Sequence, residues 1–244
     1  MAENFLDLFK NKKPIFGMLH LKGNTDEEVF ERAKKEIDLY REGGVDAVIV
    51  ENYYGNFYQM EKVLEYLQTN KFEGLIYGVN CLNNDAMGFD LANRYGASFV
   101  QFDSVAGHVK ERDDYTFEAF MKKYRKESKA FVLGGVRFKY QPYLSGRTLE
   151  EDLKIGMTRC DAIVVTQDAT GQETSMEKIN EFRKIIGDFP LVIGAGMTAD
   201  NYAEQLSVGD AAIVGSYFKD TYKDTGDVDL SHIKSFMEAV SKIR

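Results

Sequence analysis

Eight short apolar segments recur along the chain, and they constrain its fold more than any other feature. Each is rich in Val, Ile or Phe with few interruptions, which is typical of strands that are buried on both faces. We expect each segment to form a β-strand. The segments span residues 15–20, 46–51, 75–80, 98–103, 130–138, 161–166, 191–194 and 210–215.

Amphipathic helical patterns separate these segments. Val29, Ala33 and Ile37, for example, recur at the spacing that places them on one helix face. Strands that alternate with helices predict a parallel sheet covered by helices, and eight such units are the number that closes a barrel. The sequence therefore predicts an α/β fold in which residues 1–244 form a single (β/α)8 or TIM barrel domain. A doubly wound open sheet is the alternative.

Composition and charge exclude several classes of protein. Hydrophobic residues make up 44% and charged residues 29% of the chain, as in ordinary globular proteins. A net charge of −8 argues against nucleic-acid binding, which needs clustered Lys and Arg. No apolar stretch is long enough for a transmembrane segment. With Cys81 and Cys160 as its only cysteines, the chain offers no disulfide framework, and we expect a cytoplasmic protein.

The connections between the expected elements differ in length. Helix-to-strand connections such as residues 42–45 and 207–209 are short. Strand-to-helix connections such as residues 139–148 and 216–229 are longer and more polar. Active sites of TIM barrels lie at the carboxyl ends of the strands, where these longer loops are. We therefore expect the functional face there.

Glycines follow the last two apolar segments, in "GAGMT" and "GSYFK". In barrels the corresponding two loops often bind phosphate through backbone N–H groups, and a helix start adds a positive dipole. A tight strand-to-helix turn that needs glycine is the alternative. The residues expected to contact phosphate are Gly194, Gly196, Thr198, Gly215 and Ser216, with Lys219 as the neutralising charge.

Polar residues end the other segments. Glu51 and Asp103 directly follow very apolar strands, where burial would raise their pKa toward values useful for general acid or base catalysis. His20 is a candidate for proton transfer, with a structural histidine as the alternative. Arg137 and Lys139 are candidates for charge stabilisation. The candidate ligand-binding residues are Asn52, Asn80, Asp85, Thr166, Asp168, Thr170 and Gly171; a helix cap is the alternative for Asp85 and a plain turn for residues 168–174.

The common metal and cofactor motifs are absent from the sequence. It contains no HxH, HExxH or clustered Cys and His spacing, so no dedicated metal site is predicted, although weak Mg²⁺ binding by carboxylates stays open. It also contains no nucleophile elbow, no Walker motif and no GxGxxG after a strand, so no cofactor is predicted. His108 lies in the loop after Asp103, and His232 is expected to be exposed on the last helix.

An ordered set of motifs resembles the BtpA family, which includes the SgcQ-type proteins. The motifs are "KPIFGMLHL", "DAVIVENYYGNF", "YGVNCLNNDA", "DAIVVTQDATG", "VIGAGMTADN" and "AAIVGSYFK", and the resemblance covers residues 13–243. It implies a TIM barrel of the phosphate-binding kind. The functions named for proteins of this family differ. The family is named after a photosystem I biogenesis factor, SgcQ-type members are described as nucleosidases, and some relatives are described as phosphoribosylanthranilate isomerases.

Position by position, the resemblance assigns several of the residues above. The motif positions correspond to Asn52, Asn80, Asn84, Asp85, Thr170, Gly171, Gly194, Gly196, Thr198 and Lys219. Two departures stand out. Residues 135–139 read Gly-Val-Arg-Phe-Lys where the resemblance leads us to expect Asp-Val-His-x-Lys, and Asp103 stands where we expect asparagine.

The leading functional hypothesis is an enzyme that acts on a small phosphorylated ligand, a sugar phosphate or a ribosyl-containing, nucleotide-like compound. Cleavage of an N-ribosyl bond fits, because a carboxylate can stabilise an oxocarbenium-like centre. An isomerase of the phosphoribosylanthranilate type needs an acid and a base from the first and fifth strands. Those strands end in His20 and Arg137, and arginine cannot act as an acid at neutral pH, so this reaction is disfavoured.

Two non-catalytic hypotheses remain. In the first, the barrel is an assembly or stability factor that binds protein partners, and the aromatic stretch 51–60 is the best candidate for its exposed patch. The same aromatics could instead line the mouth of the barrel and stack on a flat ring. In the second, the phosphate site serves regulation by a metabolite. We expect a homo-oligomer in either case.

Overall fold

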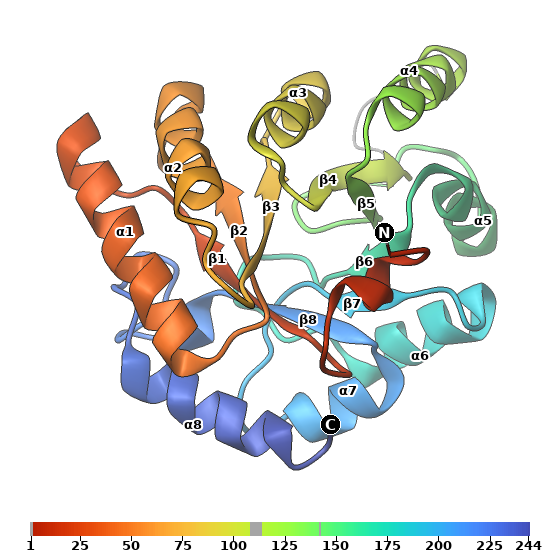
Figure 1. Ribbon diagram of the computed structural model, residues 1–244. Helices are drawn as coiled ribbons and strands as arrows, with labels where there is room; N and C mark the ends of the chain where they lie inside the picture. The colour runs from red at the N-terminus through yellow and green to blue at the C-terminus, as the bar shows by residue number, and fades with distance from the viewer. Residues whose placement is uncertain (1, 108–113, 142) are drawn as a thin grey trace.

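Eight parallel strands form a closed barrel in the computed structural model, which describes residues 2–107, 114–141 and 143–244. Each strand pairs with its neighbours in sequence order, and β8 pairs with β1 to close the ring. The helices lie outside the ring (Figure 1). The predicted (β/α)8 barrel is confirmed, and the open-sheet alternative is wrong.

The strands coincide closely with the predicted apolar segments. They are β1 (Ile15–Leu19), β2 (Ala47–Glu51), β3 (Ile76–Asn80), β4 (Phe99–Ala106), β5 (Phe131–Val136), β6 (Ala162–Val165), β7 (Leu191–Ile193) and β8 (Ala211–Val214). The largest difference is β4, which continues past Asp103 through an irregularity in its pairing with β5 between Phe102 and Ala106. Such a bulge re-aims the side chains around it.

The helices follow the strands in strict alternation. They are α1 (Asp26–Gly43), α2 (Phe57–Asn70), α3 (Asp85–Tyr95), α4 (Asp114–Glu127), α5 (Leu149–Arg159), α6 (Met176–Ile186), α7 (Tyr202–Val208) and α8 (Leu230–Ser241), with short 3₁₀ helices η1 (Phe5–Leu8) and η2 (Ser216–Phe218). Among the described residues, no helix is both long and apolar enough to cross a membrane.

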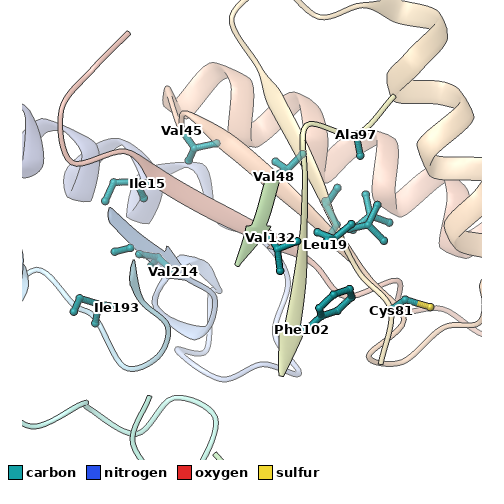
Figure 2. Close-up of a cluster of buried hydrophobic side chains, with 14 of the residues drawn as sticks. Ile15, Leu19, Val45, Val48, Cys81, Ala97, Phe102, Val132, Ile193 and Val214 are labelled. Atoms are coloured by element: carbon teal, nitrogen blue, oxygen red, sulfur yellow. The ribbon is translucent and has the colours of Figure 1, made fainter. Parts of the chain in front are cut away.

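Alternation along each strand sorts the apolar side chains into two cores. Phe16, Ile49 and Val164 belong to the core inside the barrel. Side chains of the opposite parity pack between the strands and the helices; Figure 2 shows part of this outer core, with Leu19, Val48, Phe102 and Val132 labelled. Because the period of a strand is two, the same alternation decides which polar residues face the inside at the strand ends.

The N-terminal segment closes one end of the barrel. Phe5 in η1 is 1% exposed and packs edge-on against Phe16 and Phe99, with ring centroids 6.1 and 5.8 Å away. Phe16 and Phe99 lie near the starts of β1 and β4. The amino-terminal end of the barrel is therefore filled by aromatic rings, which leaves the carboxyl-terminal end for a cavity.

Truncation of this plug should cost much of the stability of the barrel. Phe5→Ala should lower the free energy of unfolding by about 3–5 kcal/mol, because it removes a buried aromatic ring and leaves a cavity. Urea unfolding measures this change. Leu144→Ala, which truncates an exposed side chain, serves as the control and should change stability by no more than about 0.5 kcal/mol. Equal effects of the two substitutions would contradict the plug.

Candidate functional site

A cavity of about 400 Å³ opens at the carboxyl ends of the strands. One side of it is lined by ionisable and amide side chains from β1, β2, β4 and the end of β5. The other side is lined by small residues and backbone from the loops after β6, β7 and β8. The cavity thus divides into two chemically different halves at the place that the loop lengths predict.

Two carboxyl groups meet at the polar half, where Glu51 lines the cavity and Asp103 and Asn80 are not among its lining residues. Asn80 donates from Nδ2 to Glu51 Oε1 at 2.7 Å and to Asp103 Oδ1 at 3.2 Å. The three residues come from β2, β3 and β4, so neighbouring strands bring them side by side, and Asp103 lies within the bulge of β4. Together with His20, we call these residues the carboxyl half. Three sequence candidates from separate motifs are therefore brought together.

Burial changes the protonation of both carboxyl groups. It raises the pKa of Glu51 to about 8; the positive charge of Lys139 opposes this shift and the negative charge of Asp103 adds to it. Burial also raises the pKa of Asp103, against the effect of Lys139. Glu51 is therefore mostly protonated at neutral pH and can both donate and accept a proton there.

His20 contacts Glu51 as a neutral ring. Its Nε2 lies 3.5 Å from Glu51 Oε2, and Tyr53 stacks on the ring with centroids 4.8 Å apart. Burial lowers the pKa of His20 to about 3, and the charges of Lys219 and Lys139 act in the same direction, whereas Asp224 opposes them. A neutral histidine and a protonated carboxyl group can exchange a proton without creating a net charge in the cavity.

Lys139, and not Arg137, supplies the positive charge in the cavity. Arg137 turns away and donates from Nε to Asp152 Oδ2 at 2.9 Å. The backbone of Arg137 has a φ of 48°, which interrupts the alternation of β5 and turns Lys139 inward. The backbone N–H of Lys139 donates to the buried Thr166 Oγ1 at 2.8 Å, which fixes this turn. The expectation that Arg137 acts at the site thus needs correction.

The glycines in the half of the cavity formed by the loops after β6, β7 and β8 have different structural roles. A Cβ on Gly194 would lie 2.6 Å from the Val164 side chain, and one on Gly196 would lie 2.2 Å from the Gln172 carbonyl oxygen. Gly196 also has a φ of 72°. Packing and turn geometry therefore require both. Gly215 differs, because a Cβ there would approach no atom closer than 3.6 Å, so the space beside it belongs to the cavity.

Backbone N–H groups without partners line this half of the cavity. Those of Gly171, Gly196, Met197, Gly215 and Ser216 donate no hydrogen bond to the part of the chain that the structure describes. We call these five residues the amide half. Helix α7 begins only at Tyr202, so Gly196 and Met197 lie in a loop, whereas Gly215 and Ser216 stand at the start of the short 3₁₀ helix η2. Thr198 also lines it, but its N–H is held by Asn201 Oδ1 at 2.8 Å.

Lys219 does not lie in the cavity. It is almost fully buried in the loop after β8, and its Nζ is 3.6 Å from Oε1 of Glu36 on α1. Burial lowers the pKa of Lys219 and raises that of Glu36. The expectation that Lys219 neutralises a bound phosphate therefore needs correction, since its charge already has a buried partner and it fastens the loop to α1.

The remaining sequence candidates divide between the cavity and its surroundings. Thr170 lines the cavity, whereas Asp168 borders a separate groove that also contains Lys178. Asn52 Oδ1 accepts from the Leu82 N–H at 2.7 Å and ties two loops together. Asp85 is not the cap of α3: it is the first residue of that helix.

The cap of α3 is Asn84, whose Oδ1 accepts from the Met87 N–H at 3.1 Å. His108 lies outside the described residues. His232 is partly buried and not exposed, because its ring stacks on Tyr222 at 4.4 Å and its Nδ1 is 3.0 Å from the Lys219 carbonyl oxygen. Among the described residues, no group of three His, Cys, Asp or Glu side chains is arranged to hold a metal ion.

Some cavity residues were not singled out from the sequence. Gln101 lies inside the barrel on β4, and Tyr217 and Tyr222 line the cavity from the connection after β8, whereas Tyr53 belongs to the stretch 51–60 for which a position at the mouth was an alternative. The sequence does indicate the position of Gln101, because a residue two positions before Asp103 in a strand lies on the same face of the strand as Asp103. No such pattern indicates the positions of the tyrosines after β8, since loop conformation does not follow from periodicity.

A comparison with models of protein families identifies the family of this chain. The model of the BtpA family matches residues 11–242. The chain belongs to the BtpA family. An uncharacterised protein of Methanocaldococcus jannaschii is 25% identical, with 98% of this chain and 99% of that protein aligned. The photosystem I biogenesis protein BtpA of Synechocystis is 26% identical, with 96% of this chain and 90% of that protein aligned.

Solved structures confirm the fold class. The 2-keto-3-deoxy-6-phospho-gluconate aldolase of Zymomonas mobilis matches with a TM-score of 0.63 at 12% identity, covering 95% of this chain and 94% of that chain. The phosphoribosyl anthranilate isomerase of Thermus thermophilus matches with a TM-score of 0.64 at 10% identity, covering 95% and 100%. The BtpA-family barrel therefore resembles aldolases and isomerases in fold, and at these identities in fold alone.

The pH dependence of stability tests the protonation of Glu51. Its pKa is near 4.5 ordinarily and about 8 in the folded protein, so the folded state binds more protons than the unfolded state between these values. Stability must therefore fall as the pH rises through this window. Glu51→Gln cannot titrate and should reduce this fall, leaving only the part due to Asp103 and other groups.

Urea unfolding at a series of pH values from 4 to 9 measures this effect, a range that spans both pKa values with roughly a unit to spare. Glu65→Gln removes an exposed carboxylate on α2 and is the control, which should retain the fall in stability of the parent protein. An unchanged pH dependence in Glu51→Gln would show that Glu51 is ionised in the folded protein at neutral pH.

Proposed function

We propose that this BtpA-family protein is an enzyme that binds a small phosphorylated compound and transfers protons on it. The observation that carries the proposal is the row of unpartnered N–H groups in the amide half. N–H groups without a protein partner around a cavity are available to a bound acceptor, and the N–H of the buried Met197 needs one most, because buried N–H groups are almost always hydrogen-bonded. A phosphate group presents several acceptor oxygens together and fits such a row.

The carboxyl half supports the catalytic part of the proposal. Glu51 carries a proton at neutral pH that it can donate to a leaving group or pass through His20. Asp103 stands on the other side of the Asn80 amide and can stabilise positive charge that develops on the ligand. Lys139 can stabilise negative charge. Glu51 and Lys139 thus line one cavity that also offers an anion anchor, and Asp103 is joined to Glu51 through the Asn80 amide.

Cleavage of an N-ribosyl bond is the specific reaction that we propose. Protonated Glu51 would protonate the departing nitrogen as the C–N bond breaks, and ionised Asp103, joined to Glu51 through Asn80, would stabilise the oxocarbenium-like ribosyl centre. A water molecule would then add to this centre and return a proton to Glu51, so that the free base and ribose 5-phosphate leave. The N–H groups of the amide half would hold the 5-phosphate of the ribosyl group. The weak Mg²⁺ binding, the homo-oligomeric state and the cytoplasmic location expected from the sequence stay predictions.

Exposed aromatics favour a second candidate, a factor that binds protein partners. Tyr54, Phe57 and Tyr58 are 43%, 37% and 52% exposed at the start of α2. The neighbouring Tyr53 lines the cavity and stacks on His20. Residues 53–58 therefore contribute both to the exposed surface and to the mouth of the cavity. The relative in Synechocystis is named for photosystem I biogenesis. In this alternative the cavity would bind a regulatory metabolite without turnover.

Ligand binding is tested by thermal unfolding with inorganic phosphate, ribose 5-phosphate, nucleoside monophosphates and their unphosphorylated counterparts. A phosphorylated ligand at about a hundred times its Kd should raise the Tm by about 5–10 °C. Gly215→Asp should abolish this shift, because the open space at Gly215 would then hold a carboxylate. Ser207→Asp adds the same charge on the exposed part of α7 and is the control. Equal shifts with unphosphorylated compounds would contradict the phosphate anchor.

Turnover tests the roles of Glu51 and Asp103. The compounds that raise the Tm are incubated with the protein, and their conversion is followed by NMR. Glu51→Gln and Asp103→Asn should each lower kcat by about 10²–10⁴-fold while the Tm shift on binding persists, because proton transfer is lost but the anchor remains. Full activity in both variants would contradict the assignment. Binding without conversion of any compound would favour the regulatory alternative.

A further inference from the structure

We propose that the part of the ligand next to the phosphate is a hydroxylated sugar, with one hydroxyl group donating a hydrogen bond to Gln101 Oε1. The inference rests on the proposed function, because it takes the amide half as the phosphate anchor. It goes further by naming Gln101 as the residue that recognises the hydroxyl groups of the sugar. Its starting point is a second kind of unsatisfied group in the cavity, on side chains and not on the backbone.

Gln101 is the decisive residue. It is 4% exposed on β4, it lines the cavity, and its Oε1 is buried without a hydrogen-bond partner in the described part of the chain. The residues before and after it, Val100 and Phe102, are apolar and belong to the outer core. An unpaired buried amide oxygen destabilises a protein, and an apolar side chain of the same size would avoid this cost. A ligand donor is therefore the simplest partner for it.

His20 offers a second unpartnered atom on the same cavity wall. Its Nδ1 is buried and makes no hydrogen bond within the described residues. Burial keeps the ring neutral, so one ring nitrogen carries a hydrogen and the other is an acceptor. The groups that face the ring are Glu51, Tyr53 and the Asp224 segment, with the charges of Lys139 and Lys219 beyond.

Both of these unpartnered atoms need a partner from the ligand. Gln101 Oε1 needs a donor, and His20 Nδ1 needs a donor or an acceptor, according to its tautomer. A hydroxyl group is both, and a sugar presents several hydroxyl groups on one small body. A flat apolar ring or a hydrocarbon chain would bury both atoms without a partner and would bind more weakly. The part of the cavity wall that contains Gln101 and His20 therefore favours sugar phosphates over aromatic or aliphatic phosphates.

Calorimetric titration of the full chain with four compounds tests this inference. The compounds are ribose 5-phosphate, fructose 6-phosphate, phenyl phosphate and inorganic phosphate. The better of the two sugar phosphates should bind at least about tenfold tighter than phenyl phosphate and inorganic phosphate, which corresponds to about one good hydrogen bond. Phenyl phosphate shares the anchor and lacks the hydroxyl groups, so it isolates the contribution of the sugar.

Gln101→Met locates that contribution. It should weaken sugar phosphate binding by about tenfold and leave inorganic phosphate binding unchanged; in the free protein it removes both an unpaired oxygen and the side-chain hydrogen bond between Gln101 and Asp103. Gln68→Met on the exposed part of α2 is the matched control and should change neither affinity. If Gln101→Met does not fold, Gln101→Leu makes the same test.

The outcomes separate the two proposals. Binding of all four compounds with equal affinity, or tightest binding of phenyl phosphate, would overturn the sugar inference and leave the phosphate anchor in place. Unchanged sugar phosphate affinity in the Gln101 variant would do the same. If none of the four compounds binds, the proposed function itself fails, and the sugar inference with it.

Discussion

Closure of the parallel barrel is the constraint on which the rest of the structure depends. In a closed ring every second residue of each strand must face inward, and no strand can slip by one residue without exchanging its two faces. The inward positions begin with apolar residues such as Phe16 and Ala47 and end with His20 and Glu51. With Phe5 filling the other end, the same register that builds the core delivers the polar residues to a single cavity.

The chemistry of the cavity depends on the burial of its ionisable groups in the barrel interior. Burial raises the pKa of Glu51 and lowers that of His20, so both groups favour their neutral forms although they touch. The contact at 3.5 Å therefore joins two neutral groups and is not an ion pair. Across the cavity, the loops after β7 and β8 offer backbone N–H groups and no positive side-chain charge, because Lys219 is bound to Glu36, and Asp200 adds a carboxylate to this lining.

Much of this arrangement could be predicted from the sequence because it follows from periodicity. All eight strands and the pairing of Glu51 with Asp103 follow from apolar runs that end in polar residues. Arg137 could not be placed, because a positive φ at a residue other than glycine is not visible in the composition of the strand.

The loops set the other limit of sequence-based prediction. Lys219 was misplaced because the long loop after β8 folds against α1, which no local pattern encodes. The glycines of "GAGMT" were only partly understood, since packing requires Gly194 and Gly196 while Gly215 leaves space for a ligand. Gln101 shows the reverse case, in which strict alternation from Asp103 does indicate its inward position.

The central claim is that the amide half of the cavity anchors the phosphate and that the carboxyl half transfers protons. A crystal structure of the protein with a bound sugar phosphate tests this division in one measurement. The account predicts phosphate oxygens within hydrogen-bond distance of the N–H groups of Gly196 and Ser216, with the sugar directed toward Gln101 and Glu51. A phosphate bound at Lys139, or a ligand bound outside the cavity, would contradict it.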